Sequence, residues 1–170
     1  MLLLGLGSNL SSSFGNRFIN IDLAISYLES YKIKLRKKSS FYETLSYPNK
    51  KNPKFINVMI EASTYLPLTD LASVLIFIEE KLERRRNKKN DPRTCDIDII
   101  DYNSKIIDFK YKNLNFTVPH KKLIYRNFVL YPLKEVVPEW KHPKTKETIN
   151  SLINKLPNDD KNSILKINKS

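Results

Sequence analysis

The sequence predicts an α+β fold in which a mostly antiparallel sheet is flanked by helices. The order of the segments along the chain indicates this class. Extended and helical segments follow one another as strand, helix, strands, helix, strands, helix, and this order lacks the strict alternation that builds a doubly wound parallel sheet. The chain has 170 residues and 41% hydrophobic content, which suits one packed core. We therefore expect a single domain over residues 1–170, with a poorly specified C-terminal tail from about residue 156.

The first half of the chain contains three extended segments and one helix. Residues 2–6 are apolar and end in the turn-forming group Gly7-Ser8-Asn9, which predicts a first strand. Residues 33–35 and the segment through residue 44 look extended, and residues 47–54 form a loop rich in Pro, Lys and Asn. In residues 55–64, β-branched apolar residues alternate with other residues, which predicts another strand. Apolar residues at helical spacing predict a helix over about 15–30. They are Ile19, Leu23, Ala24, Ile25 and Leu28.

In the second half, Pro67 is placed to open a helix whose apolar residues repeat every three to four positions. That set is Leu71, Val74, Leu75, Ile78 and Leu82. Residues 84–93 are polar and lack apolar periodicity, which predicts a mobile loop. We expect a strand over 96–102, a turn at 103–104, a helix over about 127–137 and a short helix over 147–155.

Charge and cysteine content narrow the function classes. Lys and Arg outnumber Asp and Glu by 30 to 18, and the net charge of +12 would attract nucleic acids, anionic lipids or nucleotide phosphates without choosing among them. No apolar run approaches the roughly 20 residues of a membrane-spanning helix. Cys95 is the only cysteine, so neither an internal disulfide nor a cysteine-based zinc site can form, which fits a cytoplasmic protein.

Two acidic residues, Asp96 and Asp98, are the sharpest chemical feature. Side chains two positions apart on a strand project to the same face, so both carboxylates should point together while Ile97 and Ile99 face a core. Convergent carboxylates suit Mg²⁺, which shares its remaining positions with waters and substrate phosphates, and a pair of such ions could clamp a phosphoryl group. The alternative is a solvated strand face that carries two acids by chance.

Arginines directly precede these acids, at positions 84–86 and 93. Guanidinium groups are planar and match phosphate oxygens, so a loop of this kind can close over a polyphosphate that is held by metal. By itself, such a charge run is usually only a solvated loop. Its position next to the acids favours phosphate binding.

A set of short motifs appears in order over residues 3–139. They are Leu6-Gly7-Ser8-Asn9-Leu10, Ser39-Ser40-Phe41-Tyr42-Glu43-Thr44, Phe55-Ile56-Asn57, Ile78-Glu79, Pro92-Arg93-Thr94-Cys95-Asp96-Ile97-Asp98-Ile99, Val118-Pro119-His120 and Arg126-Asn127-Phe128. In order and spacing this set resembles the 6-hydroxymethyl-7,8-dihydropterin pyrophosphokinase family. The resemblance implies a ferredoxin-like fold that binds ATP and a pterin side by side, with two Mg²⁺ ions as cofactor. It also implies transfer of pyrophosphate from Mg·ATP to the pterin in folate biosynthesis, with release of AMP.

The resemblance assigns roles by position. Asp96 and Asp98 correspond to the metal ligands, and Arg84 and Arg93 to catalytic loop arginines that reach the phosphates. Further nucleotide-binding positions are Glu79, Ile99, Thr117, His120 and Arg126. The substrate-binding positions are Phe55 and Phe128, which sandwich the pterin, Asn57, which reads its edge, and Thr44 and Leu45. Stacking favours a flat heterocycle between two rings, and an amide offers both a donor and an acceptor.

The chain departs from the family pattern around the arginine loop. Asn90-Asp91 stands before the Pro-Arg pair, where a glycine or alanine is usual, and the loop is one residue shorter than the common bacterial length. The loop also lacks the tryptophan that often packs over the active site, and Trp140 lies far outside the motif. Lys121 replaces an aromatic that often follows the motif histidine. These differences affect the expected loop closure and nucleotide affinity more than the expected reaction.

Two other functions compete with this interpretation. A basic domain could bind nucleic acid through its positive charge. The basic run at 84–93, however, has no interleaved aromatic residue on which bases would stack. A metal-dependent nuclease or nucleotidyltransferase would need a third acidic ligand that the motif does not supply. There is no Gly-x-x-x-x-Gly-Lys loop for phosphate binding. We therefore expect ATP and the pterin as partners of a monomer, without nucleic acid or membrane.

Overall fold

The computed structural model describes residues 1–86 and 90–168 of the chain. Six strands form one sheet: β1 (Leu2–Ser8), β2 (Lys34–Lys38), β3 (Phe41–Thr44), β4 (Phe55–Ser63), β5 (Asp96–Tyr102) and β8 (Leu165–Ile167). The order is β5-β1-β4-β3-β8, and β2 also pairs with β4. Every pairing in this sheet is antiparallel. The order of β5, β1, β4 and β3 is that of a ferredoxin-like fold, so the predicted fold class is confirmed.

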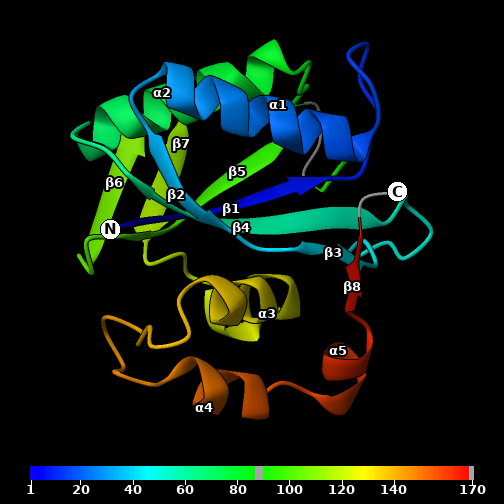
Figure 1. Ribbon diagram of the computed structural model, residues 1–170, viewed down its shortest axis with the longest axis vertical. Helices are drawn as coiled ribbons and strands as arrows, with labels where there is room; N and C mark the ends of the chain where they lie inside the picture. The colour runs from blue at the N-terminus through cyan, green and yellow to red at the C-terminus, as the bar shows by residue number, and fades with distance from the viewer. Residues whose placement is uncertain (87–89, 169–170) are drawn as a thin grey trace.

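Helices cover both faces of the sheet (Figure 1). The helices α1 (Arg17–Ser30) and α2 (Leu68–Lys81) lie on one face, and α3 (Asn127–Val136) and α4 (Ile149–Asn154) lie on the other. The helix α1 begins at residue 17 because the Asn16 side chain accepts hydrogen bonds from two backbone N–H groups of the first turn. Pro67 directly precedes α2, as its fixed backbone angle predicts.

The sheet separates two apolar clusters. Leu2, Leu4 and Leu6 face α1 and α2, whereas Leu3 faces α3. A strand that is buried on both faces reads as a continuous apolar run, which is what residues 2–6 show. The single core expected from composition is thus one apolar cluster on each face of one sheet.

Three regions were not predicted from sequence. A separate hairpin, β6 (Ile107–Tyr111) with β7 (Leu114–Val118), follows β5 and contacts α2 through a hydrogen bond between Tyr111 and Ser73. A short 3-10 turn, η1 (Leu123–Tyr125), leads into α3. The C-terminal tail is better specified than expected, because α5 (Asn158–Asn162) and β8 fold back onto the molecule.

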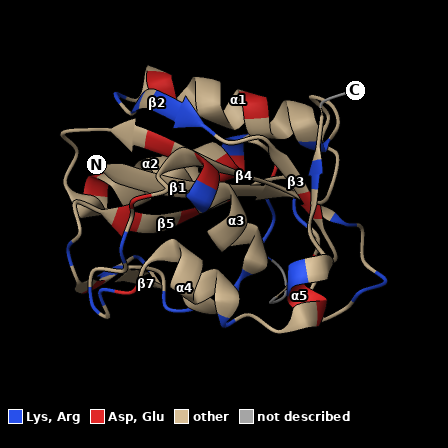
Figure 2. Cartoon of the chain, turned by 60° about the horizontal axis from the view of Figure 1, so that its bottom comes forward, with Lys and Arg blue, Asp and Glu red and all other residues tan. Residues whose placement is uncertain are grey.

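The basic residues are distributed over several elements. Figure 2 shows Lys and Arg on β2, in the loops and on α5, with Asp and Glu among them. No helix in the described part of the chain is long and apolar enough to cross a membrane.

Candidate active site

The two acids project from β5 toward the α3 side of the sheet. Asp96 and Asp98 alternate with Ile97 and Ile99, which are 5% and 4% exposed and belong to the cluster under α1 and α2. Ile100, on the same face as the acids, contacts the α3 cluster instead. The prediction that both carboxylates share one face is therefore confirmed.

Glycines on the neighbouring strand leave the surface in front of the acids without side chains. Gly5 lies opposite Asp98 and Gly7 opposite Asp96 in the pairing of β1 with β5. On its other side Gly7 pairs with Asn57 of β4. A Cβ added to Gly7 would lie 3.4 Å from Asn57 Oδ1 and 3.5 Å from the Phe55 ring. Gly7 thus separates the predicted metal ligands from the predicted pterin residues on one face.

Arg84 and Arg93 hold both oxygens of Asp96. Arg84 Nη1 lies 2.6 Å from Oδ1, and Arg93 Nε lies 2.7 Å from Oδ2. Burial alone would raise the pKa of Asp96, but the charges and hydrogen bonds of the two guanidinium groups outweigh it and lower that pKa. The carboxylate is therefore ionised and fully engaged by the chain's own cations.

The position of Arg93 is fixed by its backbone as well. Its N–H donates to Asn9 Oδ1 at 2.7 Å, and the Asn9 N–H donates to the Arg93 carbonyl at 3.0 Å. Asn9 was not a predicted site residue, although it stands in the first motif. Residues 87–89 of the predicted mobile loop lie outside the described residues.

Glu79 lies at the centre of the arginine network. Its side chain is 3% exposed, pairs with Arg84 and Arg86, and accepts a 2.8 Å hydrogen bond from the Ile97 N–H. Burial raises the pKa of Glu79 to about 7, and the charge of Asp96 adds to this, against the opposing effect of the arginines. The donors around the Glu79 carboxylate come from the chain itself. They are Arg84, Arg86 and the Ile97 N–H of β5. The role of Arg86 here was not predicted.

Arg126 and His120 lie beside Asp98. Arg126 Nη1 is 3.5 Å from Asp98 Oδ2. Burial, and then the charge of Asp96, raise the pKa of Asp98. Burial lowers the pKa of His120, although Asp98 opposes this shift. The two acids therefore differ in their electrostatic environment. Two short contacts with Arg84 and Arg93 neutralise Asp96, whereas one longer contact with Arg126 neutralises Asp98.

The predicted pterin residues gather on the other side of Gly7. Asn57 is 5% exposed, and its Nδ2 donates to Thr44 Oγ1 at 3.0 Å and to the Tyr42 carbonyl at 3.5 Å. Leu45, just after β3, is exposed. The amide donors of Asn57 are thus directed at β3, which leaves its Oδ1 on the Gly7 side.

Arginines cover both predicted stacking rings. The Arg93 Cζ lies 5.0 Å from the centroid of the Phe55 ring, and the Arg126 Cζ lies 5.3 Å from that of Phe128. Such contacts are favourable because the ring face attracts a cation. A flat heterocycle that entered here would exchange places with a guanidinium group on each ring.

Two of the predicted nucleotide residues do not point at the acids. The side chain of Ile99 is buried in the opposite cluster, so only its backbone remains for a ligand on this face. Thr117 lies in β7, where its hydroxyl donates to Asp108 Oδ1 at 2.5 Å. The structure therefore does not bring either side chain to Asp96 and Asp98.

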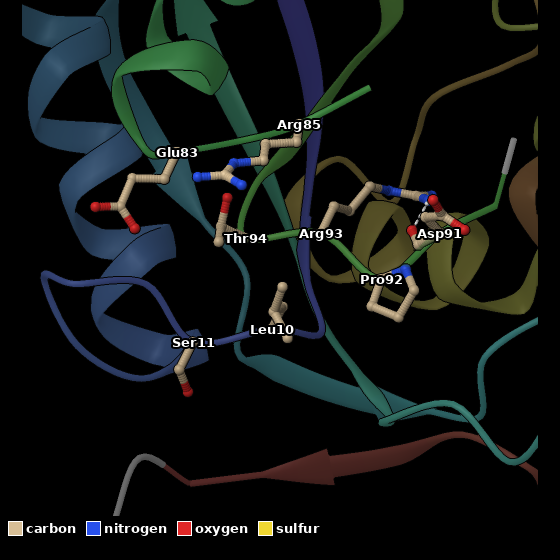
Figure 3. Close-up of a pocket in the computed structure, with 8 residues that line it drawn as sticks. All are labelled: Leu10, Ser11, Glu83, Arg85, Asp91, Pro92, Arg93 and Thr94. Atoms are coloured by element: carbon tan, nitrogen blue, oxygen red, sulfur yellow. Dashed lines mark hydrogen bonds between the residues drawn. The ribbon is translucent and has the colours of Figure 1, made fainter. Parts of the chain in front are cut away.

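A pocket of about 460 Å³ lies next to this face (Figure 3). It is lined by Leu10, Ser11, Glu83, Arg85, Asp91, Pro92, Arg93 and Thr94. Figure 3 shows the Arg85 side chain extended toward Thr94, whereas Arg93 extends away from both. Neither acid of β5 lines the pocket. The pocket therefore does not include the two predicted metal ligands.

Two carboxylates faced by several arginines on an antiparallel sheet have the chemistry that suits a polyphosphate and a divalent cation. Residues 3–138 match the family model described as 7,8-dihydro-6-hydroxymethylpterin-pyrophosphokinase. The chain belongs to this family. The resemblance found in the sequence motifs is thereby confirmed.

Individual relatives agree with this assignment. The chain is 34% identical over 150 residues to the 2-amino-4-hydroxy-6-hydroxymethyldihydropteridine pyrophosphokinase of Synechocystis, covering 88% of this chain and 72% of that protein. It is also 34% identical to the Aquifex aeolicus protein of the same name, with 82% of each chain covered. A crystal structure of Plasmodium falciparum HPPK-DHPS with pteroate matches with a TM-score of 0.71 at 18% identity, over 91% of this chain and 44% of that one. At that identity the match shows the fold.

Proposed function

We propose that the face formed by β5, β1 and β4 is where this family member transfers pyrophosphate from ATP to 6-hydroxymethyl-7,8-dihydropterin, giving the pterin diphosphate and AMP. The observation that carries the proposal is the arrangement across Gly7, with Asp96 paired on one side and Asn57 on the other. The proposed phosphate-binding and pterin-binding groups therefore lie on the two strands that flank β1, on one face of the sheet. Two substrates held side by side there would meet at the reacting atoms.

Asp96 and Asp98 fit the metal that the family implies. Both are carboxylates, the hard oxygen ligands that Mg²⁺ prefers, and they leave positions for waters and phosphate oxygens. We propose two ions at this pair. When bound, Mg²⁺ would neutralise phosphate charge that the arginines leave uncompensated.

The arginines would change partners when ATP binds. Arg84 and Arg93 neutralise Asp96 in the structure, and phosphate oxygens offer them the same charge and a matching geometry. Arg126 and His120, beside Asp98, would contact the phosphates from the α3 side. Glu79 would act through Arg84, by holding its guanidinium group in place.

The pterin would bind between Phe55 and Phe128, with Asn57 Oδ1 facing its edge and Thr44 and Leu45 at its rim. In the reaction, the hydroxymethyl oxygen of the pterin attacks the β-phosphorus of ATP. The bond from that phosphorus to the oxygen of the α-phosphate breaks, and AMP leaves. Such transfer depends mainly on alignment and charge neutralisation, which the residues of this face can supply.

The product distinguishes this function from its alternatives. Purified protein with Mg·ATP and 6-hydroxymethyl-7,8-dihydropterin should release one AMP for each pterin diphosphate formed. Omission of the pterin is the control. Release of ADP, or of AMP at the same rate without pterin, would contradict the proposal. We also propose that the chain acts as a monomer in the cytoplasm, a reducing compartment that suits the free buried thiol of Cys95.

A further inference from the structure

The C-terminal segment 158–167 follows the residues that match the family model, which end at residue 138. It comprises α5 and β8, and it returns past α3 to the edge of the sheet (Figure 1). There β8 pairs with β3, with Tyr42 opposite Lys166 and Glu43 opposite Leu165. The segment thus contacts two elements that carry proposed pterin residues, α3 with Phe128 and β3 with Thr44.

Asn127 joins this segment to the start of α3. Its Nδ2 donates to the Asp160 carbonyl at 2.6 Å and to Ser163 Oγ at 3.1 Å, while its Oδ1 accepts from the Phe128 N–H at 2.7 Å. The residue is only 8% exposed. One buried amide therefore fixes the backbone of Phe128 relative to the C-terminal segment.

The far end of α3 is tied to the same two strands. Glu135 accepts hydrogen bonds from the Ser40 N–H at 2.9 Å and from the Tyr42 hydroxyl at 2.7 Å. Lys166 of β8 lies 3.4 Å from the Glu135 carboxylate. Ser163 and Leu165 also line a small hollow with Thr44 and Leu45. The segment therefore touches both proposed walls of the pterin site.

We infer that Asn127, together with segment 158–167, is a positioning element that sets the spacing between Phe128 and Thr44 and thereby the affinity for the pterin. The inference rests on the proposed function of this face. The Nδ2 hydrogen bonds of Asn127 run to the C-terminal segment, and its Oδ1 bonds the Phe128 backbone. Arg84 and Arg93 lie on the other side of Gly7. Loss of the Asn127 hydrogen bonds should therefore weaken pterin binding much more than ATP binding.

The test compares Asn127→Ala, Asn127→Asp and Ser163→Ala with the matched control Lys161→Ala. Lys161 lies in the same segment, but its Nζ bonds the Asn154 carbonyl and no pterin element. Titration calorimetry would give Kd for the pterin, in the presence of a non-hydrolysable Mg·ATP analogue, and Kd for the analogue alone. Steady-state kinetics would give KM and kcat.

We expect Asn127→Ala to raise the pterin Kd and KM about tenfold, as the loss of one or two hydrogen bonds predicts, with the nucleotide Kd within about twofold. Asn127→Asp keeps the acceptor for the Phe128 N–H and should fall between parent and Ala. Ser163→Ala should raise the pterin Kd about threefold, and it decides the question if Asn127→Ala does not fold.

Unchanged pterin affinity in a folded Asn127→Ala or Ser163→Ala protein would overturn the inference. So would equal losses for pterin and nucleotide, or the same loss in Lys161→Ala. Failure of the parent protein to bind the pterin would instead reject the proposed function, so the two failures are distinguishable.

Discussion

Asp96 and Asp98 share a face of β5 but not an environment. Asp96 accepts from two arginines and has a lowered pKa, while Asp98 faces Arg126 at 3.5 Å and has a raised pKa. Replacing Asp96 would remove the carboxylate that Arg84 and Arg93 share, so stability and catalysis would change together. Asp98 is therefore the cleaner residue for testing the metal site.

We predict that Asp98→Asn leaves the fold intact and lowers turnover by at least about 100-fold, since each ~1.4 kcal/mol of lost barrier reduction costs tenfold. The amide keeps the shape but is a poorer ligand for Mg²⁺ than a carboxylate. Turnover across a Mg²⁺ titration and thermal unfolding are the measurements. Asp96→Asn should lose at least as much activity and also unfold at lower temperature. Turnover of Asp98→Asn within threefold of the parent would remove this residue from the site.

The two proposed stacking rings permit a second prediction. Phe55→Ala or Phe128→Ala should weaken pterin binding at least several-fold, because aromatic stacking is worth ~0.5–1.5 kcal/mol beyond the area buried. Binding of an ATP analogue should stay close to that of the parent. Phe77→Ala is the control, because that ring is exposed on α2, across the sheet. Equal losses for pterin and nucleotide would point to a folding defect.

At the residue scale, sequence reasoning found what local geometry dictates. The period of a strand was enough to place Asp96 and Asp98 on one face, whereas the resemblance to the family singled out Arg84 and Arg93. It did not reveal Asn9 as the anchor of Arg93, because that contact joins residues 84 positions apart. Contacts of this kind leave no periodic signal in one sequence.

At the scale of elements, the segment 84–93, predicted to be a mobile loop, is described at its ends and not at residues 87–89. Its two ends are held, Arg84 by Glu79 and Asp96, and Arg93 by Asn9 and Asp96. Loop closure would therefore exchange carboxylate partners for phosphate partners. The absence of the family's loop tryptophan removes an apolar contact that would otherwise help such closure.

We predict that Arg93→Ala lowers kcat much more than it weakens ATP binding, because the contacts of Arg93 should be strongest when charge shifts in the transition state. Arg85→Ala is the matched control, since that side chain extends toward Thr94 (Figure 3). Hydrogen exchange gives an independent readout. The amides of residues 84–86, 90, 91 and 93 should exchange more slowly with an ATP analogue and pterin bound, and equal exchange in both states would contradict closure.

Predicted elements were accurate where periodicity or capping defined them. The helix predicted over 127–137 is α3 at Asn127–Val136, and the strand predicted over 96–102 is β5 at Asp96–Tyr102. The β6–β7 hairpin and β8 were missed. The strand β8 has only three residues, too few for a period, and its pairing with β3 is a long-range contact.

At the scale of the whole molecule, the two faces of the sheet differ in role. The face under α1 and α2 is apolar in β1 from Leu2 to Leu6, whereas the α3 face carries glycines, acids and amides beside its own apolar cluster. Trp140 connects that cluster to β5, because its Nε1 donates to the buried Asp101 carboxylate at 2.7 Å. The Asp101 side chain also accepts from the Ser104 N–H at 2.7 Å. Trp140 thus stabilises the fold from beyond the residues that match the family model.

We predict that Trp140→Phe lowers the free energy of unfolding by about 1–3 kcal/mol, because Asp101 would lose one donor while remaining fully buried. The ring keeps most of the apolar contact, so the cost should come mainly from the unsatisfied carboxylate. Urea unfolding measures this free energy, and an unchanged m-value would show that the same surface is still buried.

Adding Asp101→Asn to Trp140→Phe should recover part of the loss, since it removes the buried charge. Glu139→Ala, at the exposed neighbour, is the control and should be nearly neutral. A change of less than about 0.5 kcal/mol in Trp140→Phe would mean that this hydrogen bond does not hold the C-terminal half to the sheet.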